Sequence, residues 1–384
     1  MLVVLGTIDP EVVPGATRSL LRAIPELEAR GWRFVYWTAV PGAAERELRA
    51  AGAEVYGEVR LLKFSLRELR QPPGLLRRLR STVGYLHRFD RALRQLAPDA
   101  VLGNTVGTLP ELAIAHLRGF PTLLHALEIL PGGARHVLGL RVLSWASDEI
   151  MVPSVAAGAQ IRAIGRVPRV VNTGIEVAGN NPVEPQRTRA DGGSAIVVGA
   201  MGQISRRKGT DVLAAAIAIA RRKAPELEFR ICGTPIDGAE RRRAQAMLEE
   251  AVRAGGRYLG RVDPVAELPQ WDILVVPSRE DPFPNVVLEA MAQGVPVVGS
   301  RVGGIPEQLG DAGVLVEPGD PIALAEAIVD LALDPARRAR LAHAARQRVS
   351  SLFSTGQQAD GTERALRAAI ASSSGRRRGH AARA

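Results

Sequence analysis

The chain has 384 residues, and its 46% of apolar residues is enough to build two domains with separate cores. Its formal net charge of +10 suits anionic partners, but only 4% of its residues are aromatic and it has no recognised basic-aromatic module, so we expect no nucleic-acid binding. Its apolar runs are shorter than the roughly 20 residues of a membrane span, and its one cysteine, Cys232, cannot form an internal disulfide. A cytoplasmic protein is the expectation.

In the first half, short apolar runs alternate with amphipathic segments, which is the pattern of a parallel sheet covered by helices on both faces. We therefore predict an α/β fold. The strands are expected at residues 2–5, 33–37, 100–102, 122–125, 149–152 and 169–171. The helices are expected at residues 17–30, 75–95 and 111–118.

Apolar periodicity disappears at residues 177–193, where Asn, Pro, Gly and charged residues take over, so this segment is the predicted interdomain linker. A second α/β pattern follows, and the chain after Pro321 is almost wholly helical. Its strands are expected at 195–198, 228–232, 272–276 and 296–299, and its helices include 211–222 and 286–292. The predicted organisation is a first domain at 1–176, a second at 194–356, a helix at 357–371 that packs back on the first domain, and a disordered basic tail at 372–384.

Several common catalytic patterns are absent from the sequence. There is no G-x-G-x-x-G after the first strand, no Walker P-loop and no G-x-S-x-G elbow. The six histidines lack metal-ligand spacing, and no Asp-x-Asp triplet occurs. A nicotinamide dehydrogenase, a serine hydrolase and a zinc enzyme are therefore disfavoured, and we expect no metal or cofactor.

The most informative segment is PSREDPFPNVVLEAMAQGVPVVG at residues 277–299. It follows a strand and enters a helix that we expect to begin at Pro284 or Asn285, where unpaired backbone amides can hold a phosphate. The carboxylate of Glu289, one turn further on, can accept hydrogen bonds from sugar hydroxyls, and the side chain of Asp281 can reach a donor sugar across the loop. A solvated helix residue and a helix cap are the simpler explanations of these two side chains.

This segment resembles the donor signature of retaining GT-B glycosyltransferases of family 4 type, in which seven residues separate two acidic residues. Asp281 and Glu289 have that spacing, and the similarity continues through LEAMAQGVPVVGSRVGGIPE. The family usually has Glu in the first place, whereas this chain has Asp preceded by Glu280, so the carboxylate that faces the sugar stays open. Pro284, where glycine is common, is a second departure. The resemblance implies two Rossmann-like domains facing across a cleft and a nucleotide-diphosphate sugar as co-substrate.

A second element is GAMGQISRRKG at residues 199–209, whose family counterpart carries two cations that bind the leaving diphosphate. Lys208 aligns with one of them, and Gln203 replaces the other, so Arg206 or Arg207 is a candidate substitute. An exposed basic turn is the alternative. The resemblance implies a donor site made of Gln203, Arg207, Lys208, Glu280, Asp281, Phe283, Pro284, Asn285, Val286 and Glu289. Gly303 and Gly304 indicate a close backbone approach or a plain turn.

In the first domain, Gly15 and Ala16 resemble a shortened glycine-rich loop near the reacting centre. His125, with Glu128 nearby, resembles the family position that contacts the donor sugar, although a lone histidine is as often a core residue. Asn104 and Thr105 could contact the acceptor, and turn formation explains them equally well. The residues expected to act in catalysis are Asp281, His125 and Lys208.

The resemblance implies transfer of a sugar with retention, without metal, to a carbohydrate, lipid-linked or small-molecule acceptor in glycan or glycoconjugate synthesis. Arginines mixed with Leu and Phe at residues 60–95 suggest peripheral contact with the inner face of a membrane; an ordinary solvated helix pair is the alternative. The competing functions are a noncatalytic nucleotide-sugar binding protein and a GT-B sugar-nucleotide epimerase.

Overall fold

A computed structural model shows the fold of most of the chain. The described residues are 1–5, 15–38, 42–56, 72–128, 134–176, 195–236 and 238–381, with the backbone alone described at 16, 72–81, 134–138, 239 and 375–381. The predicted linker at 177–193 lies outside them. Within the described part of the chain, no helix is both long and apolar enough to cross a membrane.

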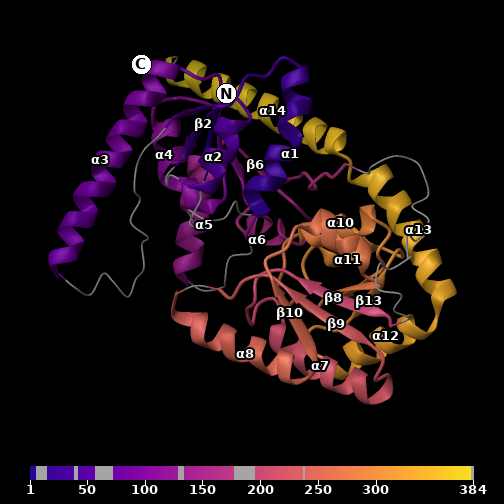
Figure 1. The fold of residues 1–384 in the computed structure, drawn as a ribbon. Helices are drawn as coiled ribbons and strands as arrows, with labels where there is room; N and C mark the ends of the chain where they lie inside the picture. The colour runs from indigo at the N-terminus through magenta and orange to yellow at the C-terminus, as the bar shows by residue number, and fades with distance from the viewer. Residues whose placement is uncertain are drawn as a thin grey trace. The chain divides into compact units, whose positions relative to one another are not determined.

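The chain forms two compact α/β units, each built on one parallel sheet (Figure 1). The first unit comprises Met1–Asn172 and Thr355–Ala384, and the second comprises Thr173–Ser354. The chain therefore leaves the first unit after Asn172 and returns to it at Thr355.

The described sheet of the first unit has seven parallel strands in the order β3-β2-β1-β4-β5-β6-β7. The strands are β1 Leu2–Leu5, β2 Val35–Thr38, β3 Glu54–Tyr56, β4 Val101–Asn104, β5 Thr122–His125, β6 Glu149–Val152 and β7 Arg169–Val170. The helices are α1 Gly15–Ala29, α2 Ala43–Ala50, α3 Pro72–Leu96, α4 Leu109–Leu117, α5 Ala134–Ala146, α6 Ala159–Arg162 and α14 Thr355–Ala381.

Alternate side chains of each strand enter two different cores. Val3 and Leu5 of β1 pack in a cluster with residues of α1 and α14, while Leu2 and Val4 pack in a cluster with residues of α3, α4 and α5. This alternation follows from the two-residue repeat of a strand, and it requires apolar residues on both faces. Helix α14, yellow in Figure 1, packs against α1 and thereby completes the first of these layers.

The described sheet of the second unit has six parallel strands in the order β10-β9-β8-β11-β12-β13. The strands are β8 Val197–Met201, β9 Glu228–Cys232, β10 Gly256–Gly260, β11 Ile273–Val276, β12 Val297–Ser300 and β13 Val314–Val316. The helices are α7 Thr210–Lys223, α8 Arg241–Arg253, α9 Pro264–Glu267, α10 Asn285–Ala292, α11 Ile305–Leu309, α12 Pro321–Leu333 and α13 Pro335–Leu352. One face of the sheet packs on α7, α8 and α12, and the other on α10, α11 and α13.

Two of the C-terminal helices begin with the same local signal. Asp320 precedes α12 and accepts hydrogen bonds from the backbone amides of Ile322 and Ala323, and Asp334 precedes α13 and accepts one from Arg337. A proline follows each aspartate, at a position where its missing N–H has no helical partner to lose. These caps explain why the helical stretch after residue 321 divides where it does.

The structure departs from the sequence prediction at the C-terminus, where the chain was expected to be disordered from residue 372. Helix α14 instead continues through Ala381. Serine and glycine, which are weaker helix formers, make up half of residues 372–381, but a helix already docked on the sheet needs no new nucleus in order to continue.

In both sheets the strand order reverses beside the first strand of the unit. The reversal lies between β1 and β4 in the first unit and between β8 and β11 in the second. Crossover connections diverge at such a point, which leaves a crevice at the carboxyl ends of the two strands where ligands of these folds bind.

Candidate functional site

The loops that leave β8 and β11 lie at the switch point of the second unit and are held together by backbone and side-chain contacts. The backbone amide of Arg279 donates to the carbonyl of Arg207 at 2.9 Å. The guanidinium of Arg279 binds both carboxylate oxygens of Asp211, at 2.6 and 2.8 Å. This bidentate pair joins the second loop to the start of α7.

Gly209 allows the two loops to approach closely. Its φ of +72° suits glycine, and a Cβ atom at this position would lie 1.8 Å from the carbonyl oxygen of Pro277. Gly303 has a similar role on the other side, because its φ is +51° and its Cβ would lie 1.7 Å from the carbonyl oxygen of Asp281. The close backbone approach considered for Gly303 from the sequence is present in the structure.

The side chains of Lys208 and Asp281 meet between these loops. Lys208 Nζ lies 2.5 Å from Asp281 Oδ2, and Ser278 Oγ donates to the same oxygen at 3.3 Å. Asp281 is only 3% exposed. The backbone carbonyl of neighbouring Glu280 accepts a hydrogen bond from the guanidinium of Arg207 at 3.1 Å. Of the two acidic residues, Asp281 is therefore the one whose carboxylate meets the ammonium of Lys208.

Helix α10 begins at Asn285, as the sequence predicted, with Pro284 as its N-cap residue. Pro284 has no side-chain donor or acceptor with which to cap the helix, and its carbonyl accepts a hydrogen bond from the buried amide of Gln308 at 3.0 Å. The first amides of a helix have no partner within the helix and carry partial positive charge. The start of α10 therefore provides a positively polarised edge beside Asp281.

These elements enclose a small cavity of about 40 Å³. Its polar lining includes Gln203, Lys208 and Asp281, and its apolar lining includes Pro284 and Val286. The volume has room for only a few water molecules, so the cavity is the inner part of a site and a larger ligand must extend beyond it.

Other predicted donor residues lie on the same elements but are not among the cavity-lining residues. They are Arg207, Glu280, Phe283, Asn285 and Glu289. The ring of Phe283 is buried and meets the ring of Phe353 edge-on at 5.8 Å between centroids, so its side chain belongs to the core under the site. Glu289 is half-buried on α10.

Cys232 also lines the cavity, which the sequence did not indicate. Burial raises the pKa of its thiol to about 12. The thiol is therefore neutral at physiological pH and is a poor nucleophile, because reactivity requires the thiolate. Its place in the cavity is that of a small apolar wall.

In the first unit, His125 ends β5 and is 2% exposed. Burial lowers the pKa of its imidazole to about 3, so the ring is neutral at physiological pH. Burial also raises the pKa of nearby Glu128, whose carboxylate accepts a hydrogen bond from the backbone amide of Val106 at 3.2 Å.

Asn104 ends β4 beside His125 and is completely buried. Thr105 follows with a φ of +103°, which is strained for a residue other than glycine. Gly15 is the first residue of α1, and Ala16 follows it in the helix. Gly15 and Ala16, which were expected in a glycine-rich loop, therefore lie in the first turn of α1.

The chain resembles known glycosyltransferases in sequence. The model of the family described as Glycosyl transferases group 1 matches residues 195–334. A D-inositol 3-phosphate glycosyltransferase of Saccharomonospora viridis is 32% identical over 237 residues, which cover 56% of this chain and 55% of that protein. A glycogen synthase of Mycobacterium tuberculosis is 35% identical over 191 residues, covering 48% and 44%. The chain thus spans about half the length of these relatives.

Solved structures show the same fold over nearly the whole chain. The HepE protein of Anabaena, solved in complex with UDP, superimposes with a TM-score of 0.75 at 20% identity, covering 95% of this chain and 98% of that one. Sucrose-phosphate synthase of Thermosynechococcus elongatus gives a TM-score of 0.75 at 22% identity, covering 96% and 99%. The chain therefore has the GT-B fold, and residues 195–334 of its second unit match the model of the family described as Glycosyl transferases group 1.

Proposed function

We propose that the protein is a retaining, metal-independent glycosyltransferase that uses a nucleotide-diphosphate sugar. The observation that carries the proposal is the pairing of Lys208 with buried Asp281 at the switch point of a group 1 domain, next to the start of α10. The HepE structures with UDP and with UDP-glucose make a uridine donor the first to test.

The proposed chemistry divides the charge of the reaction between two groups of atoms. Cleavage of the anomeric bond leaves negative charge on the diphosphate and positive charge on the sugar. The ammonium of Lys208 and the amides that begin α10 would stabilise the departing diphosphate, and each preorganised group of this kind is worth about 3 kcal/mol where water is excluded. The carboxylate of Asp281 would face the sugar once the diphosphate competes for Lys208.

Retention would follow if the acceptor attacks from the side of the leaving group and its proton passes to the leaving phosphate oxygen. His125 is neutral and buried, so in this proposal it binds sugar hydroxyls and carries no charge. Glu289, one turn into α10, would accept hydrogen bonds from the nucleotide's sugar hydroxyls. The roles of His125 and Glu289 come from the family resemblance, and they hold only if the diphosphate binds at Lys208.

The experiment compares Lys208→Ala with Lys223→Ala. Lys223 lies in the same unit but pairs with Glu326 on the surface, so its replacement removes the same charge away from the site. We expect UDP to raise the melting temperature of the parent and of Lys223→Ala, and Lys208→Ala to bind UDP about 10- to 100-fold more weakly, the worth of a hydrogen bond to a charged group.

Consumption of UDP-glucose by the same three proteins tests the activity. Loss of turnover in Lys208→Ala alone is the expected result. Equal UDP affinity in all three proteins contradicts the proposed site. If the parent binds UDP but does not consume UDP-glucose, with or without candidate acceptors, a noncatalytic binding protein is favoured. Conversion of UDP-glucose to an isomer favours an epimerase.

We further propose that the acceptor is presented at a membrane surface by the first unit. The described part of α3 exposes Val83, which is 64% exposed, together with Arg88 and Arg91. Co-sedimentation with anionic vesicles in low salt should fall when Arg77, Arg78 and Arg80 are replaced by alanine; no binding by the parent ends this idea.

A further inference from the structure

Arg279 joins the loop after β11 to the loop after β8 at several points. Its backbone amide donates to the carbonyl of Arg207 at 2.9 Å. Its guanidinium donates to the carbonyl of Arg206 at 3.1 Å and to the two carboxylate oxygens of Asp211, at 2.6 and 2.8 Å. The guanidinium of Arg207 in turn donates to the carbonyl of Glu280 at 3.1 Å. We call Arg279 and Asp211 the loop clamp.

The loop clamp holds the chain on both sides of Lys208. Arg206 and Arg207 come directly before this lysine, and Asp211 lies three residues after it, in the first turn of α7. The stem of a lysine has four rotatable carbons, so its ammonium reaches one fixed place only at a cost in side-chain entropy. A backbone that is held at both ends removes the further freedom that the loop would add.

The carboxylate that Lys208 meets is held by other contacts. Asp281 accepts a hydrogen bond from Ser278 Oγ on Oδ2 at 3.3 Å, and its carbonyl accepts one from the backbone amide of Gly304 at 3.2 Å. Asp281 is 3% exposed, and a carboxylate buried to this extent needs a cation beside it. The position of Asp281 is therefore fixed within its own surroundings, and the position of Lys208 depends on the clamp.

The two clamp residues do not line the cavity at which Lys208 and Asp281 meet. Their side chains are 27% and 33% exposed. Burial by itself would raise the pKa of the Asp211 carboxyl, but the hydrogen bonds from Arg279 lower this pKa below its ordinary value. The pair is therefore charged on both sides, and charge-assisted bidentate pairs have a well-defined geometry.

We propose that Arg279 and Asp211 are positioning residues: they set the place of the Lys208 ammonium against Asp281 and, through it, the grip on the diphosphate of the donor. The diphosphate comes from the proposed function, but the place of the ammonium can be measured without any ligand. A clamp that only stabilised the fold would change the melting temperature and leave the surroundings of Lys208 as they are.

Lysine acetylation tests the place of the ammonium directly. The chain has three lysines, so the reaction of each with acetic anhydride can be followed separately by mass spectrometry. Lys223 is paired on the surface of the same unit and serves as the internal reference. In Arg279→Met and in Asp211→Asn, we expect Lys208 to react about fivefold faster or more relative to Lys223, because hydrogen bonds to charged groups are worth about tenfold or more and their loss frees the amine from Asp281.

Arg230→Met is the matched control. Arg230 belongs to the same unit, and its guanidinium also bridges separate elements, with hydrogen bonds to Glu228 at 2.8 Å and to Glu267 at 3.1 Å. It is not among the residues that line the cavity. This variant should lower the melting temperature at least as much as Arg279→Met does and leave the acetylation of Lys208 unchanged, when all proteins are compared below the lowest melting temperature.

Two further variants separate positioning from a general loss of stability. Arg279→Lys keeps the charge but not the planar fork, so its Lys208 should react at a rate between those of the parent and Arg279→Met. The double variant of Arg279→Met with Asp211→Asn should react no faster than Arg279→Met alone, because Asp211 acts through Arg279. Additive effects, or a Lys208 that reacts in Arg279→Met as it does in the parent, overturn the proposal.

Consumption of UDP-glucose and binding of UDP by the same variants relate the clamp to the proposed function. We expect kcat to fall about 100-fold in Arg279→Met, which is the effect of misplacing a group by about 1 Å, and KM to rise less, because the ammonium of Lys208 is still present. An active parent whose kcat is unchanged in Arg279→Met overturns the proposal.

A failure of the clamp and a failure of the proposed function give different results. If Lys208 reacts faster in the clamp variants but the parent neither binds UDP nor consumes UDP-glucose, the clamp positions Lys208 and the proposed function is wrong. If the parent binds UDP through Lys208 and consumes UDP-glucose while the clamp variants match it in acetylation and in kcat, the proposed function stands and the clamp is structural only.

Discussion

Gly209 permits an approach between two loops that no side chain would allow, and the proposed donor site is therefore sensitive to its substitution. Gly209→Ala should destabilise the protein by about 2–4 kcal/mol, from the positive φ and from the contact with the carbonyl of Pro277 together. Urea unfolding measures the effect. UDP affinity should fall as well, because relief of the contact separates the loop of Lys208 from that of Asp281.

Gly260→Ala is the control for Gly209→Ala. Its φ of +70° nearly equals that of Gly209, but a Cβ atom would meet nothing within 4 Å. The cost should therefore be about 1–2 kcal/mol, from the backbone conformation alone. Equal losses in the two variants would show that the close approach to Pro277 does not matter.

His125 should make stability depend on pH. Its pKa is lowered in the folded protein from 6.5 to about 3, so between these values the unfolded chain binds a proton that the folded chain does not. The contribution of the neutral His125 ring to the free energy of unfolding is complete above pH 6.5 and is lost as the pH falls toward 3. Relative to His125→Asn, the parent should lose about 1.4 kcal/mol per pH unit below that point.

Chemical denaturation at pH 7, 6 and 5 measures this difference. Above pH 6.5 the ring is neutral in the folded and in the unfolded chain. The difference in the free energy of unfolding between the parent and His125→Asn should therefore be constant there. If this difference stays constant down to pH 5, the imidazole is hydrated in the folded protein and its pKa is not lowered.

The sequence predicted which loops approach each other at the proposed donor site better than it predicted the direction of their side chains. The spacing of Asp281 and Glu289 and the basic turn at Lys208 located the loops. Whether Glu280 or Asp281 turns inward depends on the approach of Gly303 to the carbonyl of Asp281, a contact between segments that no local pattern encodes.

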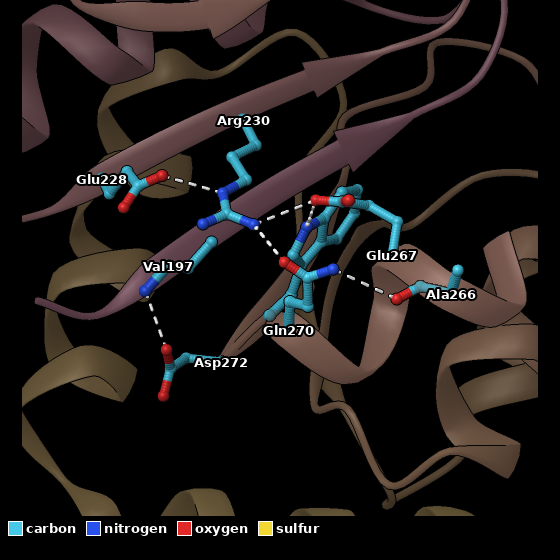
Figure 2. A network of polar contacts seen from close by, with 8 residues as sticks. Val197, Glu228, Arg230, Ala266, Glu267, Gln270 and Asp272 are labelled. Atoms are coloured by element: carbon cyan, nitrogen blue, oxygen red, sulfur yellow. Dashed lines mark hydrogen bonds and ion pairs between the residues drawn. The ribbon is translucent and has the colours of Figure 1, made fainter. Parts of the chain in front are cut away.

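At the level of elements, β9 is tied to the segment before β11 by a network of charged side chains (Figure 2). Arg230 on β9 donates to Glu228, Glu267 and Gln270 at 2.8, 3.1 and 3.0 Å. Glu267 also accepts a hydrogen bond from the indole of Trp271 at 2.8 Å. The network holds that indole over Gly199, where a Cβ atom would lie 2.0 Å from the ring.

Arg230→Met should therefore destabilise the second unit by about 2 kcal/mol, because it leaves the carboxylate of Glu267 partly buried with less compensation. Arg301→Met is the matched control, since its pair with Glu317 is exposed and should be worth less than about 1 kcal/mol. Urea denaturation distinguishes them. Equal effects would show that the network contributes no more than a surface ion pair.

The central strands were predicted from the sequence, and the strands missed lie at or near the sheet edges. Strands β1, β5, β6 and β9 occupy the predicted residues, because each is an apolar run buried in the sheet. Strands β3, β10 and β13 end their sheets and were not predicted. β3 and β13 have three residues each and β10 has a glycine at both ends, so pairing with a neighbour and not intrinsic preference makes them strands.

At the level of the whole molecule, the first unit depends on a helix from the end of the chain. Ala359, Leu366 and Ala369 of α14 are fully buried in its core, and the amide of Gln358 donates to the carbonyl of Ser19 at 2.9 Å. A chain that ends at Ser354 should lose the cooperative unfolding of the first unit. It should keep a transition that UDP shifts upward, because the second unit ends at Ser354.

Differential scanning calorimetry with and without UDP checks this prediction. Truncation after Ser374 is the control, since it removes only the last residues and keeps the hydrogen bond from Ser373 to the carbonyl of Gly119. It should leave both transitions nearly unchanged. A chain ending at Ser354 that unfolds like the parent would show that α14 adds little to the first unit.

The return of the chain to its first unit makes the second unit an insertion between Asn172 and Thr355. The first unit is therefore built from two separate parts of the chain, and the second unit from one continuous part between two junctions. Recombination at those junctions would exchange the unit that carries Lys208 and Asp281 and leave the sheet of the first unit intact. A chimera that carries the cassette of a relative, joined at these two residues, should accept the relative's donor and the parent's acceptor.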